Sequence, residues 1–484
     1  MSKEILVNIE PQEKRVAIVS DGRLEEFYIE RPQDKTIVGN IYKGKIEAVL
    51  TNLGAAFVDI GLPKKGFLYL SEIEEDFEST LTDKSSPPRA KEIKKGQEVL
   101  VQAVKESFGT KGPRLSTEIG LAGRYLVLMP QGYSQIGVSR RIEDEAERQR
   151  LRKILSEFKF SKNAGFIVRT AASGRSRQEL LRDANFLLKL WKRIEKIIHK
   201  KKAPALVYEE YDLTLRIIRD SFTDDVSKLI VDSKTEYYRI MRFMRTFLGY
   251  LAGRVELYRG EALFEGKDIE RQINRTFENK VYLKSKAYIV IEPTEGLVVI
   301  DVNSGGFKKK LDQEEAIFKV NCEAAQEIAR QLILRDLGGI IVIDFIDMVK
   351  ESHRREVLHI LKKALSNDRA KYDILGISKF GLVEITRERI HKTVQTLSYQ
   401  ACPYCQGKGK VKSAITMSIY ALKELRRFLK GKSLKREVNL TLNSAVCDEI
   451  LKAKKNLIFI ERCFRTKINL IPNPALHIED MKIS

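Results

Sequence analysis

The amino-acid sequence predicts a multidomain protein that combines α/β and α+β units. Its 484 residues exceed the usual size of one domain and leave room for several. In its second half, apolar runs of β-branched residues alternate with amphipathic helical segments, which is typical of parallel sheets. Closer to the N-terminus, short strands with glycine corners indicate a small barrel.

The charge balance indicates a polyanionic partner. The chain has 87 Lys and Arg against 66 Asp and Glu, a net charge of +21, and such an excess usually accompanies nucleic acid or an anionic membrane. No apolar run is long enough to span a bilayer, and MSKEILVNIE has no signal-peptide pattern. Five cysteines do not make a disulfide framework in a chain of this length. We therefore expect a cytoplasmic protein that binds nucleic acid and has no membrane span.

Residues 1–36 predict a meander of short strands. Apolar and polar residues alternate there, and turns are expected at Pro11-Gln12 and Asp21-Gly22. Residues 213–276 predict charged helices around the apolar segment RIMRFMRTFLGYL. We interpret both segments as scaffold.

Residues 37–117 predict a five-stranded barrel of the OB type, because short strands, glycines and lysines interleave there. Strand alternation places Phe57, Phe67 and Tyr69 on the outer face, where rings beside basic groups can stack on single-stranded nucleic acid. The alternative is that these rings pack against a neighbouring domain. The basic residues of this rim are Lys43, Lys45, Lys65, Lys111 and Arg114. The stretch 79–96 predicts a long mobile loop.

Residues 118–212 predict a helix, a strand (GFIVRTAASG) and a long basic helix, which Ser176 and Glu179 open as a capping box. Arg169 and Thr170, followed by small residues, can bind a phosphate through a guanidinium, a hydroxyl and backbone N–H groups. From these residues alone, an ordinary surface arginine is the better interpretation.

Two apolar runs, VVIDVNSGGF and IIVIDFIDM, predict the position of the main functional site. Each indicates a buried parallel strand that ends in an aspartate, Asp301 in one and Asp344 in the other. The segment 313–336 between them predicts a helix, with Gly338 at the position that ends it. Strand, helix and strand make a right-handed crossover, so both carboxylates should meet at the carboxyl edge of one parallel sheet.

A metal-dependent phosphoryl-transfer site is the working hypothesis for this edge. Two neighbouring carboxylates repel each other unless a proton or a cation joins them, and oxygen ligands suit Mg²⁺. One aspartate at a strand end is more often a turn or cap residue, but a matched pair flanked by Asn303 and Asp347 reverses that weighting. Asn303 can orient a water or a phosphate oxygen. Three basic residues downstream can neutralise phosphates: Arg369, Lys371 and Lys379.

The segment ACPYCQGKGKV predicts a zinc knuckle, because a glycine-rich turn follows Cys402 and Cys405 where a redox dithiol motif would open a helix. Structural zinc takes four ligands. Cys447 and Cys463 can complete the site, or a second protomer can supply its own pair, and spacing leaves both possibilities open. Residues 413–484 predict a small basic α/β domain without a defensible motif.

Several stretches resemble the ribonuclease E/G family of bacterial endoribonucleases over nearly the whole chain. They are NIYKGKI, AAFVDIG with GFLYLSEI, YLVLMP, GFIVRTA, IDVNSG, EIARQL…RDLGGIIVIDFIDM and CPYCQGKG. IDVNSG and VIDFIDM at this spacing, with CPxC further on, are highly specific. Because the chain stops where one branch of the family continues into a long disordered scaffold, we expect the compact branch.

The resemblance implies a particular domain order. Residues 1–36 and 213–276 would form one split ribonuclease-H-like subdomain that lacks that fold's catalytic carboxylates. The other parts would be an OB-fold RNA-binding domain (37–117), a 5′-phosphate sensor (118–212), a deoxyribonuclease-I-like catalytic subdomain (277–399), a zinc link (400–412) and a small C-terminal α/β domain (413–484).

The resemblance also implies a reaction. Asp301 and Asp344, supported by Asn303, would hold a catalytic Mg²⁺ that activates a water or stabilises charge as single-stranded RNA is cut to a 5′-phosphate and a 3′-hydroxyl. The processes would be rRNA maturation and mRNA or tRNA processing or decay. Two other classes compete: a non-catalytic RNA-binding or ribosome-assembly factor, and a metal-dependent DNA nuclease.

The remaining contacts implied by the resemblance concern RNA and a second protomer. A 5′-monophosphate would be sensed by Arg169, Thr170 and the backbone of Val127. RNA would be gripped by Phe57, Phe67 and Lys111, and Lys371 would stand where the family often has Arg. Cys402 and Cys405 would share one Zn²⁺ with the same pair of a second protomer, which gives a homodimer and leaves a tetramer open.

Overall fold

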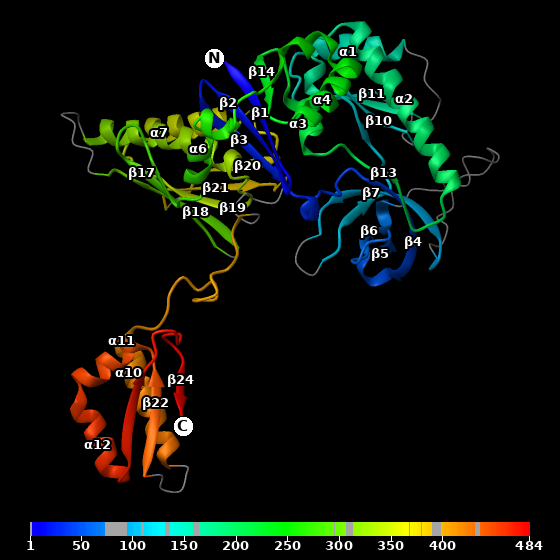
Figure 1. The fold of residues 1–484 in the computed structure, drawn as a ribbon. Coiled ribbons are helices and arrows are strands. Elements are labelled where there is room, and N and C mark those ends of the chain that lie inside the picture. Colours follow the sequence, from blue (N-terminus) through cyan, green and yellow to red (C-terminus); the bar gives the residue numbers. More distant parts are fainter. Residues whose placement is uncertain are drawn as a thin grey trace. The chain divides into compact units, whose positions relative to one another are not determined.

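The computed structural model describes residues 2–72, 94–107, 111–130, 136–157, 164–294, 296–305, 313–366, 368–378, 380–389, 398–430 and 436–484. The chain divides into two compact units, residues 1–397 and 398–484, and Figure 1 follows it from end to end. The expected loop at 79–96 falls mostly outside the described residues, and so does Lys379.

The first sheet of the larger unit combines strands from the two segments interpreted as scaffold, residues 1–36 and 213–276. The predicted N-terminal meander is confirmed, and two later strands extend it in the order β15-β14-β1-β2-β3. Its strands are β1 (Lys3–Glu10), β2 (Glu13–Ser20), β3 (Arg23–Glu30), β14 (Val226–Val231) and β15 (Val255–Leu257). Only helices were expected over 213–276. That expectation missed β14, a buried strand that runs parallel to β1 within a highly charged segment.

Helices cover this sheet, and their apolar residues form two buried clusters with it. The helices are α3 (Leu213–Ser221), α4 (Lys234–Phe247), α5 (Leu263–Gly266) and α6 (Ile269–Arg275). The segment RIMRFMRTFLGYL lies in α4 and the 3₁₀ turn after it, and it supplies Ile240, Met244 and Leu248 to the core.

The predicted five-stranded barrel is confirmed. Five strands close on themselves because the first also pairs with β7, and β13 (Ala205–Tyr208) adds to the outside of the first. They are β4 (Ile41–Leu50), β5 (Ala55–Asp59), β6 (Gly66–Tyr69), β7 (Glu98–Lys105) and β8 (Arg114–Ser116). Val58, Leu68 and Leu115 fill the interior without exposed surface, so the side chains that alternate with them face outward.

A four-stranded sheet with two helices follows the barrel in the chain. The strands pair in the order β11-β12-β10-β9. The elements are β9 (Leu121–Ala122), β10 (Leu126–Met129), β11 (Ile136–Val138), β12 (Gly165–Val168), α1 (Glu145–Ser156) and α2 (Arg177–Lys200). The predicted capping box of Ser176 and Glu179 opens α2, whose apolar stripe packs on the sheet.

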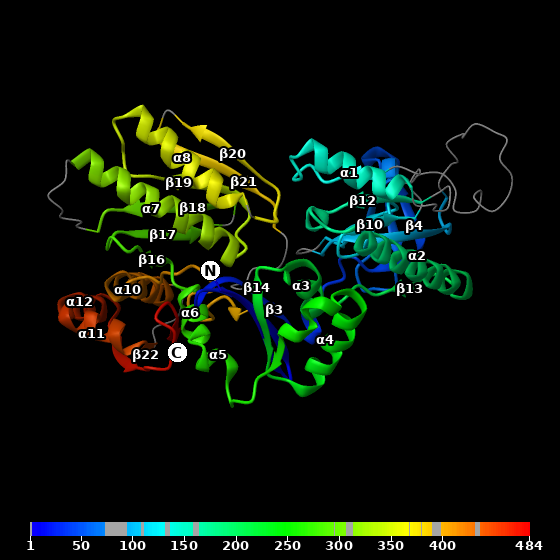
Figure 2. The same cartoon turned by 90° about the horizontal axis from the view of Figure 1, so that it is seen from above.

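The third sheet of the larger unit carries both predicted aspartates, and we call it the aspartate sheet. Its order is β16-β17-β18-β19-β21-β20. Its strands are β16 (Lys280–Tyr282), β17 (Tyr288–Pro293), β18 (Leu297–Asn303), β19 (Gly339–Asp344), β20 (Tyr372–Ile377) and β21 (Leu382–Arg387). Two helices, α7 (Gln313–Leu334) and α8 (Glu351–Leu365), share a buried core with alternate residues of these strands (Figure 2). The other face of the strands carries the exposed residues of the alternation.

The end of α7 differs from the prediction. Asp336, not Gly338, takes the left-handed conformation after the helix, with φ of +47°, and the next amide, Leu337 N, bonds back to Leu332 O at 3.0 Å. The carboxylate of Asp336 accepts a hydrogen bond from Arg387 at 2.8 Å, which favours an acidic residue there. Position 338 favours glycine for another reason, because a Cβ on Gly338 would lie 2.4 Å from Cγ of Arg389.

The smaller unit is a three-stranded α/β domain in which two strands run parallel. Its elements are α10 (Ala414–Lys430), β22 (Glu437–Leu442), α11 (Ser444–Lys452), α12 (Lys454–Phe464), β23 (Lys467–Pro472) and β24 (Met481–Ile483). It has its own buried core.

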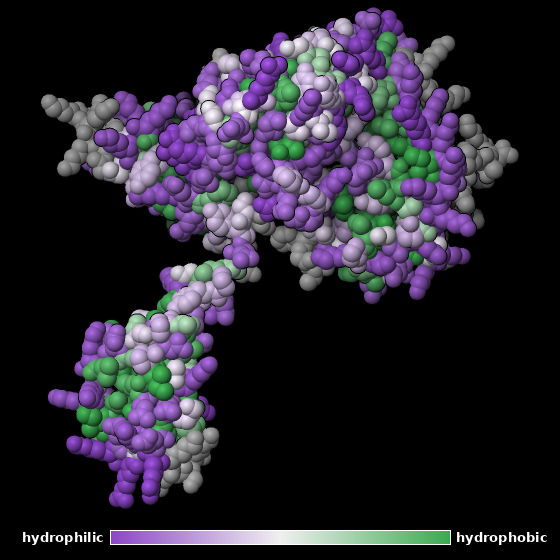
Figure 3. All heavy atoms as spheres, in the orientation of Figure 1, coloured by the Kyte–Doolittle hydropathy of each residue, from purple (hydrophilic) through white to green (hydrophobic). Residues whose placement is uncertain are grey.

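Hydrophilic residues cover most of the face drawn in Figure 3. Within the described ranges, every helix is too short or too polar to cross a membrane.

Candidate active site

The two predicted aspartates stand side by side. In the parallel pairing of β18 and β19, Asp301 lies directly opposite Asp344, which confirms the predicted crossover. Both carboxylates are on the exposed face of the aspartate sheet. Asn303 belongs to the same group, because its Nδ2 donates a hydrogen bond to Oδ2 of Asp301 at 2.7 Å.

The electrostatics of this pair favour a cation. Partial burial raises the pKa of Asp344, and the negative charges of Asp301 and Asp347 raise it further. A divalent cation between the carboxylates would remove that repulsion. The donor set consists of hard oxygens, which fits Mg²⁺. Across the described residues, no group of three or more His, Cys, Asp or Glu side chains forms a metal cage, so Mg²⁺ here would take its other ligands from water or phosphate.

A buried asparagine on α7 holds the loop that follows Asp344. Asn321 has no exposed surface. Its Nδ2 donates to Ile346 O at 2.7 Å, and Ile346 N donates to its Oδ1 at 3.2 Å. Sequence reasoning missed Asn321, although an amide among the apolar residues of α7 was a usable signal.

The start of α7 holds the other end of the same loop. Glu314 accepts hydrogen bonds from the backbone N–H groups of Val349 and Lys350, both at 3.1 Å, and bonds from Lys350 first and Val349 second lower its pKa. His353 places Nδ1 3.1 Å from the Glu314 carboxylate, and its ring stacks on Phe318 with centroids 4.2 Å apart. The segment from Asp344 to α8 is therefore fixed from α7 at two points.

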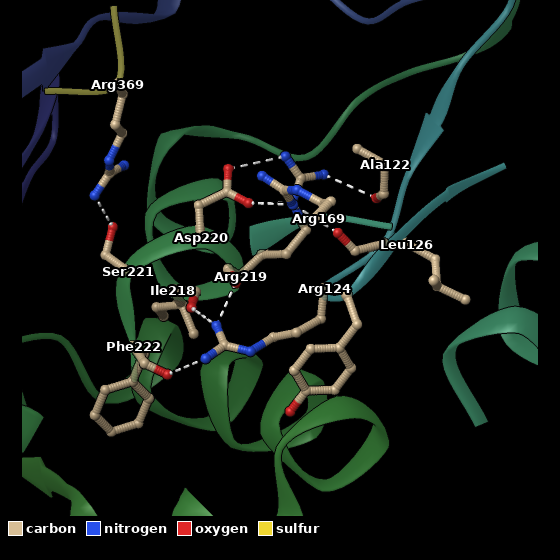
Figure 4. A network of polar contacts seen from close by, with 12 residues as sticks. Ala122, Arg124, Leu126, Arg169, Ile218, Arg219, Asp220, Ser221, Phe222 and Arg369 are labelled. Carbon is tan, nitrogen blue, oxygen red and sulfur yellow. Dashed lines mark hydrogen bonds and ion pairs between the residues drawn. The ribbon is translucent and has the colours of Figure 1, made fainter. Parts of the chain in front are cut away.

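The residues of the predicted phosphate sensor also come together. Arg169 follows β12, and its Nη1 donates to Gly123 O at 2.7 Å. The same nitrogen donates to Oδ1 of Asp220 at 2.7 Å (Figure 4). Thr170 lies next to it, with Oγ1 3.3 Å from Oγ of Ser139. Val127 is on the neighbouring strand β10, opposite Ile167 of β12. Among the described residues, the side-chain hydrogen bonds of Arg169 use Nη1 alone.

Asp220 anchors Arg169 to the scaffold. Burial raises the pKa of Asp220, but the charges of Arg219 and Arg169 outweigh burial and bring the pKa to about 2, so the carboxylate is ionised at neutral pH. Arg219 in turn donates to Ala122 O at 3.1 Å. Beside this group, buried Arg124 donates to the last carbonyls of α3, those of Ile218, Arg219 and Phe222 (Figure 4).

A buried carboxylate on α2 shapes the turn before β10. Asp183 accepts hydrogen bonds from the backbone N–H groups of Arg124, Tyr125 and Leu126 at 3.3, 2.8 and 3.0 Å. A Cβ on Gly123 would lie 2.6 Å from this carboxylate, so only glycine fits there. Sequence reasoning missed Asp183. The signal was a charge in the apolar stripe of α2, one residue before buried Ala184.

The outward rings of the barrel form one aromatic group. Phe57 and Phe67 are opposite each other on β5 and β6, with centroids 6.1 Å apart and an interplanar angle of 73°. Tyr69 continues the row, 5.0 Å from Phe67, and the Arg114 guanidinium lies 4.9 Å from the Tyr69 centroid. The outward placement is confirmed.

Part of the predicted basic rim is already paired with carboxylates. Lys65 forms ion pairs with Glu47 and Asp59 at 3.2 Å each, and Lys43 pairs with Glu98 at 2.8 Å. Lys111 is exposed. The carboxylates therefore offset part of the positive charge of the rim, and its role in RNA binding stays a prediction.

Of the basic residues before β20, one is paired with other side chains and one is exposed. Arg369 donates to Oγ of Ser221 at 2.6 Å and pairs with Glu26 at 3.3 Å, so its guanidinium faces the scaffold. Both contacts use its Nη2, and its role in neutralising phosphates near the aspartates stays a prediction. Lys371 is exposed.

In the smaller unit, backbone amides surround the two thiols of the CPYC segment. The amides of Cys405 and Tyr404 lower the pKa of Cys402, and Gly409 N donates to Sγ of Cys405 at 3.3 Å. Cys447 is buried in the core. No third Cys or His joins the two thiols within the described part of the chain, so the alternative in which Cys447 and Cys463 complete the site is not formed.

Three protein-family models match successive parts of the chain, and curated relatives match most of its length. The model of the "Ribonuclease E/G family" matches residues 120–390, that of the "S1 RNA binding domain" residues 35–118, and that of the "RNase E/G, Thioredoxin-like domain" residues 401–484. Ribonuclease G of Salmonella typhimurium is 43% identical over 435 residues, which are 88% of each chain. Ribonuclease G of Haemophilus influenzae is 41% identical over 88% of this chain and 87% of its own. Ribonuclease E of Escherichia coli is 38% identical over 94% of this chain and 43% of its own.

Proposed function

The chain belongs to the ribonuclease E/G family, and we propose that it is a Mg²⁺-dependent endoribonuclease that hydrolyses phosphodiester bonds in single-stranded RNA. The observation that carries the proposal is the pairing of Asp301 with Asp344 on adjacent parallel strands, with Asn303 bonded to the first. Paired carboxylates of this kind suit an ion that also binds a phosphate.

The residues of the site divide the work between them. Asp301 and Asp344 would hold Mg²⁺, which when bound polarises a phosphoryl oxygen and assists the attack of water. Asn303 fixes the Asp301 carboxylate through Nδ2, and its Oδ1 accepts no hydrogen bond from the described residues, so it can receive one from a water. Asn321 and Glu314 keep the loop after Asp344 in place. Attack of water on phosphorus with loss of the 3′ oxygen would leave a 5′-phosphate and a 3′-hydroxyl.

RNA binding is proposed at two further surfaces. On the S1 domain, the ring faces of Phe57 and Phe67 can stack on bases, and exposed Lys111 can meet the backbone. At the sensor, Arg169 and Thr170 would bind a terminal 5′-monophosphate beside the Val127 backbone, because the free Nη2 and Nε of Arg169 suit two phosphate oxygens. Lys371 would add charge.

A zinc-linked homodimer is proposed because one chain supplies too few ligands for zinc. Cys402 and Cys405 supply two thiolates, structural zinc needs four ligands, and no further ligand of the described chain reaches them. A second protomer would supply the other pair. The proposed processes, in the cytoplasm, are rRNA maturation and mRNA or tRNA processing or decay, and family membership supports them.

The test compares cleavage of a short single-stranded RNA by the native chain and by Asp301→Asn. Substrates carry a 5′-monophosphate or a 5′-hydroxyl, Mg²⁺ is present or absent, and binding of Mn²⁺ is followed by electron paramagnetic resonance. We expect Asp301→Asn to lose roughly a thousandfold in rate and to bind Mn²⁺ weakly, while it remains folded and still binds RNA.

Other outcomes favour the competing classes. RNA binding without Mg²⁺-dependent cleavage by the native chain would indicate an RNA-binding or assembly factor. Equal cleavage of a matched DNA would indicate a nuclease without selection for ribose. Equal cleavage by the native and Asp301→Asn chains would remove the aspartate pair from the site.

A further inference from the structure

A tyrosine pair lies on the aspartate sheet beside the proposed metal site. Tyr282 is on β16 and Tyr288 on β17, and Lys280 of β16 reaches over both rings. We call these three residues the tyrosine ledge. The proposed metal site, phosphate sensor and barrel surface do not use it.

Strand pairing connects the ledge to the site. Tyr282 is opposite Tyr288, and Tyr288 is opposite Asn303. Directly opposed residues of antiparallel strands point to the same face, so the two rings and the Asn303 amide form one row across the exposed face. With strands about 4.8 Å apart and Asn303 two positions after Asp301 on β18, the Cα atoms of Tyr282 and Asp301 lie roughly 12 Å apart.

The next row of paired residues on these strands also connects the ledge to the aspartates. Lys280 is opposite Val290, and Val290 is opposite Asp301, which is itself opposite Asp344. The ledge and the aspartate pair therefore occupy one continuous surface of four adjacent strands, β16 to β19.

The ring geometry leaves Tyr282 open to a ligand. Tyr282 is 67% exposed, and its centroid lies 6.0 Å from that of Tyr288 at an interplanar angle of 58°. The Lys280 ammonium lies 3.6 Å from the Tyr288 centroid and 5.1 Å from the Tyr282 centroid. Tyr288 and the lysine thus support one side of Tyr282. A ring this exposed contributes little to the core, so burial does not explain it.

We propose that the tyrosine ledge is a base-stacking subsite for single-stranded RNA next to the scissile phosphate. A base would stack on the Tyr282 ring, and the flexible Lys280 would turn to a neighbouring phosphate. The inference rests on the proposed nuclease function and deepens it. Charge argues for this occupant, because the carboxylates of Asp301 and Asp344 repel RNA phosphates wherever no cation covers them, whereas ring stacking holds a base without relying on charge.

Binding is measured first, without cleavage. In the Asp301→Asn background, the anisotropy of a dye-labelled single-stranded RNA reports the dissociation constant of full-length protein. Tyr282→Ala should raise that constant at least about fivefold, and Tyr282→Phe should leave it nearly unchanged, because stacking needs the ring and not the hydroxyl. Tyr238→Ala is the matched control: Tyr238 is 59% exposed on α4 and its ring lies 5.5 Å from that of Tyr237.

Cleavage then locates the stacked base. With Asp301 intact, single abasic positions are placed in turn on either side of the cleaved bond. One position near the bond should raise the KM of the native chain, and the same position should have no further effect in Tyr282→Ala, with kcat similar in both.

The outcomes separate this proposal from the proposed function. An unchanged dissociation constant in Tyr282→Ala, or an equal loss in Tyr238→Ala, overturns the ledge while cleavage by the native chain leaves the nuclease standing. Absence of cleavage by the native chain overturns the nuclease, and the anisotropy series still reports whether the ledge binds RNA.

Discussion

Single residues in this protein act through a few close polar contacts. The proposed metal site depends on Asp301 and Asp344 standing opposite each other on one exposed face, and Asn303 donates a hydrogen bond to the first of them. Arg169 is available to a phosphate because Asp220 and the Gly123 carbonyl hold only one of its nitrogens. At this scale, the loss of one charge or one amide should change a specific kinetic quantity more than stability.

Asp220→Asn should weaken the selection of a 5′-monophosphate. Asp220 is ionised, with a pKa of about 2, and it positions the Arg169 guanidinium. Without that charge, we expect the ratio of kcat/KM between 5′-phosphorylated and 5′-hydroxyl RNA to fall by roughly tenfold, about 1.4 kcal/mol. The ratio is the readout, because partial unfolding lowers both rates equally.

Asp225→Asn is the control for this change, since Asp225 pairs with Lys3 and not with the sensor. An unchanged ratio in Asp220→Asn would show that Arg169 is positioned without it.

Elements are joined by polar side chains that cross between them. Asn321 and Glu314 connect α7 to the loop after β19, and Asp183 connects α2 to the turn before β10. Asp212 both caps α3 and binds Lys14 of β2 and Arg239 of α4. Each of these groups bonds to its partners in place, so its removal leaves those partners unpaired.

Asn321→Leu should raise the Mg²⁺ concentration needed for half-maximal cleavage several-fold, with a smaller effect on the rate at saturating Mg²⁺. The loop after Asp344 loses two hydrogen bonds, so the ligand is less well placed. Direct Mn²⁺ binding should weaken in parallel. Gln331→Leu is the matched control, because Gln331 is also buried on α7 but bonds to Glu327 and Arg335. Both variants should lose about 1–3 kcal/mol of stability, and an equal Mg²⁺ shift in both would contradict the role of Asn321.

Asp212 should make folding sensitive to acid. Burial raises the pKa of Asp212, but hydrogen bonds from Arg239 and Lys14 outweigh it and bring the pKa to about 2 from an ordinary 3.8. A lowered pKa contributes stability that is complete above the unfolded-state value and is lost as pH falls from about 4 to about 2. The contribution is about 2 kcal/mol. Urea unfolding at pH 7 should therefore show Asp212→Asn less stable by about that amount, and the difference should disappear near pH 2. A difference that does not change with pH would contradict this account.

The whole molecule combines one large unit, which carries the aspartate pair, the proposed sensor and the barrel, with a smaller unit that begins at Ser398 and includes the CPYC segment. Backbone amides lower the pKa of Cys402, Gly409 N donates to Sγ of Cys405, and two thiolates are half of a zinc site. In the proposed zinc link, two chains would assemble through the metal.

Cys402→Ser should abolish the zinc and the dimer together. Native mass spectrometry should find one zinc per two native chains and monomers after chelation, and the variant should be a metal-free monomer with both units folded. Cys463→Ser is the control and should keep zinc and dimer, since Cys463 is exposed away from any cluster of ligands in the described chain. Zinc bound one per monomer in the native chain would contradict the shared site.

The sequence by itself determined the features that repeat locally. Alternation placed Phe57 and Phe67 outward, the capping pattern marked the start of α2, and two apolar runs located Asp301 and Asp344. Backbone geometry fixes these periodicities, so neighbouring residues suffice to predict them.

Only the tertiary structure decided which distant groups meet. Asp183, Asn321 and Asp220 find partners far along the chain. Long-range contacts also turned Arg369 toward Glu26, placed β14 beside β1, and ended α7 at an aspartate that bonds Arg387. Hydrogen bonds and ion pairs depend on atoms that approach within a few ångströms, and no periodicity of the sequence encodes that approach between remote segments.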